Sequence, residues 1–148
     1  MVPEERAKTL QQALEAMRWE RVEGDFALFG FPELPTDADL ALLADEPAQL
    51  VREGGETTLL VRAQHAAVVL RRHPLARVQM PLSWIRFRMT MEWELVGFLA
   101  HVSVALAGAG VPIGAVCGYS RDHLFVAKEH LATTERVLAR LFPSSKEA

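Results

Sequence analysis

Two short segments in the second half of the chain hold the side chains best suited to bind a small polar molecule. Met91-Glu92-Trp93-Glu94 precedes a predicted helix, and Gly118-Tyr119-Ser120-Arg121-Asp122 forms a predicted turn. Backbone amides at a helix N-terminus lack partners and attract an anion. A carboxylate such as Asp122 attracts a cation through a charge-assisted hydrogen bond. The amides after Glu92 and the Asp122 carboxylate would therefore suit a ligand that carries both charges.

Two glycines would give such a ligand room. Gly114 and Gly118 lie at the two ends of the strand predicted before the turn, and a residue without a side chain lets backbone and ligand approach closely. We expect a pocket built by residues 89–97, 113–118 and 119–123, completed by the other half of the chain or by a partner chain. The candidate ligand-binding residues are Met91, Glu92, Trp93, Glu94, Gly114, Gly118, Tyr119 and Asp122.

The same residues also have purely structural interpretations. The glycines at 108, 110 and 114 fit helix ending and tight packing. Asp122 can accept hydrogen bonds within its own turn, and Trp93 can cover the edge of a core. Cys117, on a strand expected to be buried, is predicted to be an inert packing residue.

Catalytic and metal chemistry find little support in the sequence. The five histidines, at 65, 73, 101, 123 and 130, show no spacing that would place metal ligands on one face. No nucleophile elbow and no glycine-rich phosphate loop is present. The nearest approach to a catalytic group is His123 beside Asp122 and Cys117, and neighbouring positions on a hairpin are weak evidence for catalysis. We expect a protein that is not an enzyme and needs no cofactor.

Composition favours a folded protein with one domain or two small ones. Of the 148 residues, 50% are hydrophobic, and the formal net charge is −3. This charge does not favour nucleic-acid binding, and the basic run from Arg71 to Arg77 is interpreted as a solvated helix end. A single cysteine excludes an internal disulfide framework and fits a cytoplasmic location. The acidic start of the chain does not resemble a signal peptide.

One uncharged stretch invites comparison with a membrane span. From Leu95 to Ser120 the chain has no Asp, Glu, Lys or Arg. However, Gly108-Ala109-Gly110-Val111-Pro112 would end any helix near the middle of this stretch. The sequence therefore predicts a buried helix followed by a buried strand, and no membrane association.

The first half mixes helical and strand patterns. Residues 3–17 read as an amphipathic helix, and the apolar run from Phe26 to Phe31 as a strand. The turn-rich segment from Pro32 to Pro47 is expected to form a loop with one helical turn near residues 40–43. Gly54-Gly55 between two β-prone runs indicates a hairpin, and a helix is predicted over residues 63–70.

The second half gives a clearer order of elements. From Leu82, apolar residues at 85, 87 and 89 alternate with Trp84, Arg86 and Arg88, whose row is expected to face solvent or a dimer partner. A helix with its apolar stripe at 95, 99, 102 and 106 follows, then a strand over 113–118, a strand over 123–127 and a helix over 129–142. The order β-α-β-β-α lacks a closing strand, unless the other half supplies it. It predicts an α+β, ferredoxin-like βαββαβ fold with helices on one face of an antiparallel sheet.

Three consecutive motifs resemble one known family. The run from Phe87 to Leu99 resembles the strand–loop–helix opening of ACT domains of the arginine-sensor (CASTOR-like) and aspartate-kinase types. The run Ala107-Gly108-Ala109-Gly110-Val111-Pro112-Ile113 is similar to their helix-to-strand passage, L-x-x-A-G-I-x-I. The run from Cys117 to Val126 is similar to their hairpin S-T-Y-D-T-D-Y-I-L-V, with Ser120, Arg121 and His123 in place of Asp, Thr and Tyr.

The resemblance implies a domain organisation and a function. Two earlier runs, Asp25 to Leu28 and Glu56 to Val61, are similar to strands of a divergent first ACT-like half. We expect an N-terminal helix over 1–20, a divergent ACT-like unit over 21–80 and an ACT-like domain over 81–148, packed in tandem. Members of the family are regulatory modules that bind amino acids, often between two ACT units, and that commonly pair side by side. The resemblance thus implies a non-catalytic amino-acid sensor that forms a homodimer or binds a partner protein; the alternative is an ACT-like oligomerisation module without a ligand.

Overall fold

The computed structural model describes residues 6–143, which form two compact units. Unit 2 is contiguous and comprises Glu23–Leu82. Unit 1 combines the residues up to Val22 with those from Ser83 onward, so that unit 2 is inserted into it. The N-terminal segment, predicted as a helix over 1–20 packed with the two units, groups with unit 1, where Ala7, Ala13 and Met17 are buried in the core.

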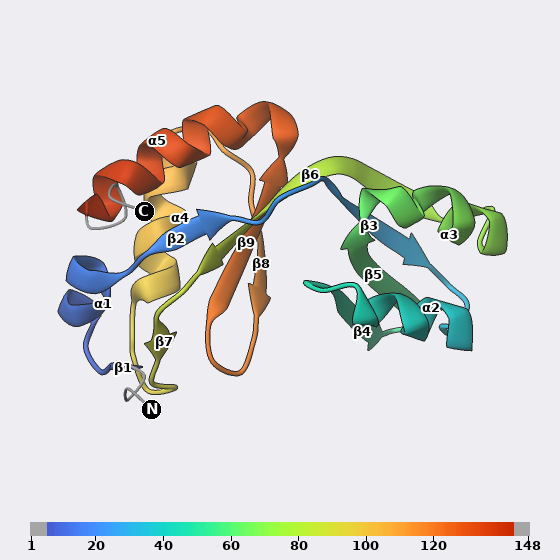
Figure 1. Cartoon of the computed structure of the whole chain (residues 1–148), viewed down its shortest axis with the longest axis horizontal. Coiled ribbons are helices and arrows are strands. Elements are labelled where there is room, and N and C mark those ends of the chain that lie inside the picture. The colour runs from blue at the N-terminus through green and yellow to red at the C-terminus, as the bar shows by residue number, and fades with distance from the viewer. Residues whose placement is uncertain (1–5, 144–148) are drawn as a thin grey trace. The chain divides into compact units, whose positions relative to one another are not determined.

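Unit 2 alternates strands and short helices. Its elements are β3 (Phe26–Phe31), α2 (Asp37–Ala41), β4 (Gln49–Glu53), β5 (Glu56–Arg62), α3 (Ala66–Arg72) and the first part of β6 (Arg77–Phe87), with 3-10 turns at Leu42–Ala44 and Ala63–His65. The sheet has the order β4-β5-β3-β6, and the neighbouring strands pair antiparallel (Figure 1). The hairpin predicted around Gly54-Gly55 is confirmed, and both glycines take positive φ angles.

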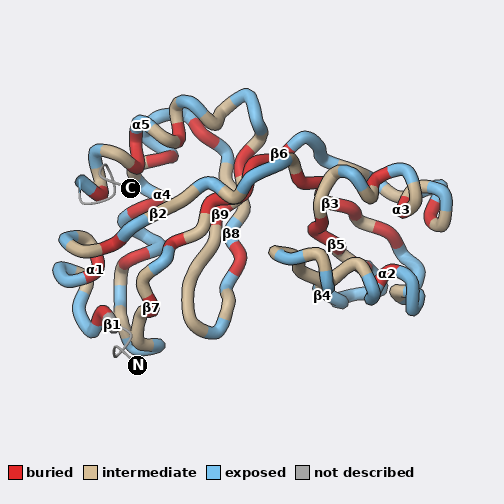
Figure 2. The backbone as a smooth tube through the Cα atoms, in the orientation of Figure 1, coloured by how far each residue is buried: buried red, intermediate tan, exposed pale blue. Residues whose placement is uncertain are grey.

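The helices of unit 2 cover one face of its sheet. Alternate residues of β3 and β5 point toward α3 and the turn after α2, which gives the period of two expected of a half-buried strand. This core contains Ala27, Phe29, Phe31, Leu59, Val61, Ala66 and Val69. Figure 2 shows the buried positions recurring along these strands.

Unit 1 repeats the same plan with a different chain order. Its elements are β1 (Arg6–Ala7), α1 (Leu10–Ala16), β2 (Trp19–Arg21), the last part of β6, β7 (Thr90–Met91), α4 (Phe98–Gly108), β8 (Gly114–Cys117), β9 (Asp122–Ala127) and α5 (Leu131–Leu141), with a 3-10 turn at Lys128–His130. Its sheet runs β8-β9-β6-β2. The strands from β6 onward give β-α-β-β-α as predicted, and the missing closing strand is β2.

The closing strand therefore comes from the beginning of the chain. β2 pairs antiparallel with β6, with Trp19 opposite Phe87 and Arg21 opposite Ile85. Numbered by their place in a βαββαβ unit, the strands of both sheets stand in the order 2-3-1-4. Both units thus have the ferredoxin-like, ACT-like α+β architecture that the sequence predicted.

The core of unit 1 lies between its sheet and α1, α4 and α5. Phe87 meets Phe98 edge to face at 5.0 Å between ring centroids, and Phe142 closes the cluster at 5.8 Å from each ring. Alternate residues of β6 and β9 join them, as do buried residues on each of the three helices. Among residues 6–143, no helix combines the length and the apolar character that crossing a bilayer requires.

Two predicted helices differ in extent because local signals at their N-termini decide where they begin. The N-terminal helix starts after Thr9, whose hydroxyl accepts from the Gln12 amide at 3.2 Å while the Gln12 side chain accepts from the Thr9 amide. Residues 3–5 of the predicted helix lie outside the described residues. The helix predicted from residue 95 is α4, which starts only after Gly97, a residue with a φ angle of 99°. Its buried residues are therefore Phe98, Val102 and Leu106 rather than the predicted set at 95, 99, 102 and 106.

Trp84 also departs from the sequence prediction. It was expected in an exposed row with Arg86 and Arg88, yet it is buried and meets the His123 ring edge on at 5.6 Å. Arg86 is partly exposed and Arg88 is exposed, as predicted. Both pair with Glu20, at 3.3 and 3.1 Å.

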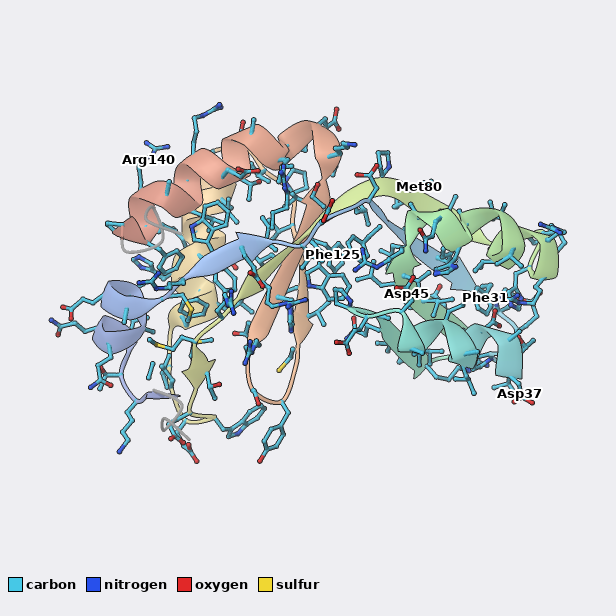
Figure 3. All side chains as sticks on the ribbon, in the orientation of Figure 1. Phe31, Asp37, Asp45, Met80, Phe125 and Arg140 are labelled. Atoms are coloured by element: carbon cyan, nitrogen blue, oxygen red, sulfur yellow. The ribbon has the colours of Figure 1, made fainter. Side chains whose placement is uncertain are left out.

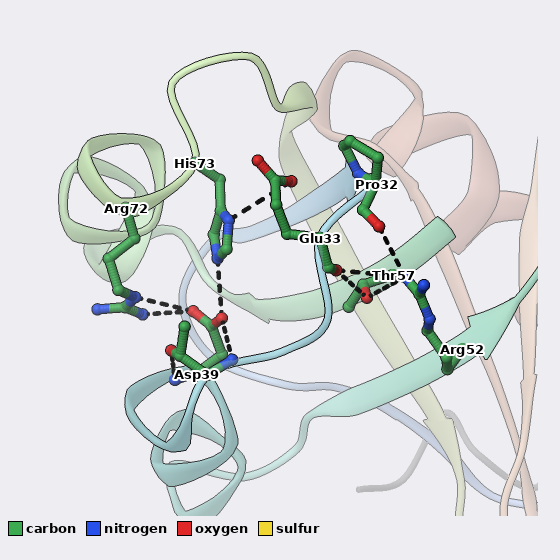
Figure 4. Close-up of polar contacts among 8 residues, drawn as sticks. Pro32, Glu33, Asp39, Arg52, Thr57, Arg72 and His73 are labelled. Atoms are coloured by element: carbon green, nitrogen blue, oxygen red, sulfur yellow. Dashed lines mark hydrogen bonds and ion pairs between the residues drawn. The ribbon is translucent and has the colours of Figure 1, made fainter. Parts of the chain in front are cut away.

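A buried ionic cluster ties α2 to α3 within unit 2. The Asp39 carboxylate accepts from the Arg72 guanidinium at 2.6 and 2.9 Å and lies 2.8 Å from His73 Nε2 (Figure 4). Burial alone would raise the pKa of Asp39, but hydrogen bonds from the Thr36 amide, His73 and Arg72 lower it to about 2. The His73 ring stacks on Phe31 at 3.8 Å, which fixes the imidazole against the core.

We predict that Asp39→Asn lowers the free energy of unfolding at pH 7 by about 3 kcal/mol, because it leaves Arg72 without its buried partner. The folded-state pKa lies below the ordinary value of 3.8, so the stabilisation is present above about pH 4 and is lost as the pH falls toward 2. The shift corresponds to roughly 2 kcal/mol. Urea unfolding of Asp39→Asn, wild type and the exposed control Asp37→Asn at pH 7 and pH 2.5 measures this. A difference between wild type and Asp39→Asn that is as large at pH 2.5 as at pH 7 would contradict it.

Candidate functional site

An open pocket of about 230 Å³ lies in unit 1, between the start of α4 and the β8–β9 hairpin. The loop that follows β7 forms one wall, and the hairpin forms the other. The Met91 amide donates to the Ser120 carbonyl at 3.3 Å, which ties the two walls together at one end. The lining residues are Met91, Glu92, Trp93, Leu95, Gly97, Phe98, Leu99, Ala100, Cys117, Gly118, Tyr119, Ser120, Arg121 and Asp122.

The first turn of α4 gives the pocket its donors. The first backbone bond of this helix runs from the His101 amide to the Gly97 carbonyl, at 2.9 Å, and no side chain caps the helix. The amides of Phe98, Leu99 and Ala100 precede that bond, so they have no carbonyl partner within the helix. The expected anion-binding end thus exists. However, it lies at residues 98–100 rather than directly after Glu92, because a turn closed by the bond from the Leu95 amide to the Glu92 carbonyl precedes the helix.

The hairpin gives the pocket its carboxylate. Asp122 pairs across the hairpin with Cys117, and both side chains lie on the face of the sheet that carries the helices. Burial raises the pKa of Asp122, and a hydrogen bond from the Cys117 thiol opposes the rise. A partly desolvated carboxylate of this kind is stabilised by a bound cation.

A wider hollow adjoins the pocket and shares its rim. It has about 600 Å³ and reaches Thr90 and Glu94. Trp93 and Tyr119 line both cavities and are almost fully exposed, at 85% and 105% of their reference areas. These two aromatic side chains stand free at the pocket mouth, where a ligand or a partner surface could cover them.

The structure brings together seven of the eight candidate residues. Met91, Glu92, Trp93, Gly118, Tyr119 and Asp122 line the pocket, and Glu94 lines the adjoining hollow. Gly114 does not line either cavity. It lies opposite Phe125 on β9, which Figure 3 labels, and a Cβ atom at position 114 would fall 2.0 Å from the Phe125 ring. Its role is to admit the aromatic ring of its cross-strand neighbour.

Sequence reasoning missed several lining residues. Cys117 was expected to be buried, yet it is exposed and lies on the pocket wall, because β8 is the last strand of the sheet. The alternation of the strand could have shown that Cys117 and Asp122 share a face, since they are the last pair before the turn. Leu99 was assigned to the core, and the start of the helix at Gly97 turned it toward the pocket.

The structure separates the one catalytic grouping that the sequence offered. His123 pairs with Val116 and therefore lies on the opposite face of the sheet from Cys117 and Asp122. Burial, then the charges of Arg86 and Arg121, lowers the pKa of His123 to about 4, so the imidazole is neutral near pH 7. Within the described residues, no three His, Cys, Asp or Glu side chains form a group that could hold a metal ion.

Comparisons with known proteins support the fold. The sequence matches no protein-family model and no curated protein. The structure is similar to that of a protein of unknown function from Vibrio cholerae, described as a possible transport protein, with 26% identity, a TM-score of 0.69, and 89% of this chain and 94% of that one covered. It is also similar to the ligand-free regulatory subunit of aspartate kinase from Thermus thermophilus, with 16% identity, a TM-score of 0.60, and 88% and 99% covered. The ACT-like fold is therefore shared with regulatory parts of aspartate kinase.

We predict that Gly114→Ala lowers the free energy of unfolding by about 1–3 kcal/mol, because the new methyl group displaces the Phe125 ring. Gly108→Ala is the matched control: it lies at the end of α4 with open space around it, and alanine there should be neutral or stabilise by up to about 1 kcal/mol. Urea unfolding monitored by circular dichroism compares the two. Equal stability of both variants would mean that Phe125 does not fill the space at Gly114.

Proposed function

We propose that this chain is a small, non-catalytic regulatory protein that binds a free amino acid in the unit 1 pocket. The fold supports a regulatory role, since proteins with this architecture include regulatory subunits of aspartate kinase. The exposed thiol of Cys117 suits a reducing, cytoplasmic location.

The observation that carries the proposal is the pairing of charges across the pocket. Unpaired amides at the N-terminus of α4 favour a carboxylate, through hydrogen bonds and through the helix dipole. Asp122, on the opposite wall, favours an ammonium group. The α-carboxylate and α-ammonium of an amino acid carry these two charges on one carbon, and a pocket of about 230 Å³ suits a ligand smaller than a drug-sized molecule.

The remaining walls would contact the side chain of the ligand. Met91, Leu95 and Leu99 offer apolar surface, while Glu92 and Arg121 place opposite charges at the rim. Arg121, which stands where the resembling motif has a neutral residue, adds a second group able to bind a carboxylate.

A second candidate function is self-association without a ligand. Its support is the number of exposed apolar side chains at the pocket and on α4: Trp93, Val96 and Tyr119 are exposed, as are Leu99 and Val104 of α4. Exposed apolar groups that gather on one surface often mark an interface. Here the partner would be a second copy of the chain.

We predict that one amino acid, or a few related ones, raises the temperature of unfolding when the twenty standard amino acids are screened at millimolar concentration. A ligand that binds only the folded state stabilises it by about 2.7 kcal/mol at a hundred times its dissociation constant. Asp122→Ala should weaken binding tenfold to a hundredfold, since a charge-assisted hydrogen bond contributes about 1.5–3 kcal/mol. The exposed control Glu129→Gln should bind like wild type.

Affinity should also fall as the pH is lowered through the pKa of Asp122, because the protonated acid no longer attracts the ammonium; that pKa lies above its ordinary value. A flat screen together with a dimer on size-exclusion chromatography would reject amino-acid binding and favour self-association. If Asp122→Ala leaves binding unchanged, the ligand binds at another place on the chain.

A further inference from the structure

The two units can be compared position by position, because both sheets have the same strand order. In each unit the second and third strands form a hairpin, and one residue pair near the turn faces the helices. In unit 1 this pair is Cys117 and Asp122, and Asp122 lies two residues before the core residue Leu124. In unit 2 it is Arg52 and Thr57, two residues before the core residue Leu59.

The pair in unit 2 is bonded to the loop that follows the first strand. Arg52 Nη1 donates to the carbonyl oxygens of Pro32 and Glu33 at 3.0 and 3.2 Å, and it lies 2.9 Å from Thr57 Oγ1. The Thr57 hydroxyl donates to the Glu33 carbonyl at 2.7 Å, and Thr57 is completely buried. Figure 4 shows the guanidinium and the hydroxyl joining the strands to this loop.

The same loop also approaches the end of α3. The Glu33 carboxylate lies 3.7 Å from His73 Nδ1, and His73 Nε2 lies 2.8 Å from Asp39. The hydrogen bonds that hold the loop of unit 2 are those from the hairpin. The corresponding loop of unit 1, after β7, stands across an open pocket from Cys117 and Asp122.

We propose that Arg52 is a built-in ligand: its guanidinium fills the place in unit 2 that corresponds to the pocket of unit 1. The chain then binds one amino acid, in unit 1, and unit 2 has no free site. The statement about stoichiometry rests on the proposed function, whereas the role of Arg52 does not.

The chemistry of the two pairs explains why one place is filled and the other open. Arg52 and Thr57 are hydrogen-bond donors to the loop, so the protein satisfies the loop carbonyls with its own side chains. Asp122 is an acceptor, and Cys117 is a short side chain that cannot reach across the pocket. In unit 1 neither side chain bonds the hairpin to the loop across the pocket, so that space is left for a bound molecule.

Removal of the guanidinium should open a site that a small guanidinium compound can fill. Arg52→Ala should lower the temperature of unfolding by about 5 °C, the loss expected when one charged hydrogen-bonding group is removed from a domain of this size. Methylguanidine hydrochloride at 20 mM should restore at least half of this loss, with sodium chloride at equal ionic strength as the reference salt. Arg52→Lys, which keeps a donor cation, should unfold close to wild type.

The matched control is Arg71→Ala, which removes an exposed arginine from α3 of the same unit. Methylguanidine should leave the unfolding temperatures of Arg71→Ala and wild type unchanged. If Arg52→Ala unfolds at the temperature of Arg71→Ala, or if methylguanidine shifts all variants alike, Arg52 is not a built-in ligand.

Calorimetric titration of the wild type with each of the twenty standard amino acids tests the stoichiometry. One bound molecule per chain is expected, and two per chain would overturn the proposal. If no amino acid binds the wild type, the proposed function fails, and the methylguanidine experiment still decides the role of Arg52.

Discussion

The pairing of β2 with β6 is the interaction on which unit 1 depends. A four-stranded sheet of order 2-3-1-4 needs a strand beside its first one, and in unit 1 the chain has already passed that position before the insertion of unit 2. Three residue pairs make this contact. The segment that precedes β2 contains α1 and the fully buried Ala13 and Met17, which pack in the same core as α4. The position of α4, and therefore of its free amides, follows from this closure.

The two units show how one architecture can leave an open pocket beside its hairpin or bond the hairpin to the neighbouring loop. The difference lies in one residue pair near each hairpin turn. An arginine and a threonine reach the neighbouring loop, while a cysteine and an aspartate do not. The hairpin turns also differ in length: two glycines form the turn of unit 2, and four residues form the turn of unit 1. Short hairpins with large donor side chains close the space, whereas longer ones with small or acidic side chains leave it open.

The sequence predicted most of the fold because local signals and periodicity agreed. The alternation of β6, the glycine hairpin of unit 2 and the order of elements after residue 82 were all readable from residue spacing. The source of the closing strand was not, because three residues, Trp19–Arg21, carry no pattern that distinguishes a strand. Helix starts were displaced where a local signal overrode the apolar spacing: the capping box at Thr9 and the positive φ angle of Gly97. Within the site, the hairpin and loop residues were found from their types, whereas Gly114 and Cys117 were misassigned, because their surroundings depend on a cross-strand ring and on a free sheet edge.

The insertion of unit 2 has a consequence for the order of folding. Unit 2 is contiguous, so all its strands are available for pairing once the first part of β6 has emerged from the ribosome. In unit 1, β2 must wait for β6, and the core that covers it is complete only when α4, β9 and α5 have followed. Domains generally fold as units during synthesis. The inserted unit is therefore the first to mature, and the pocket forms only when nearly the whole chain has been made.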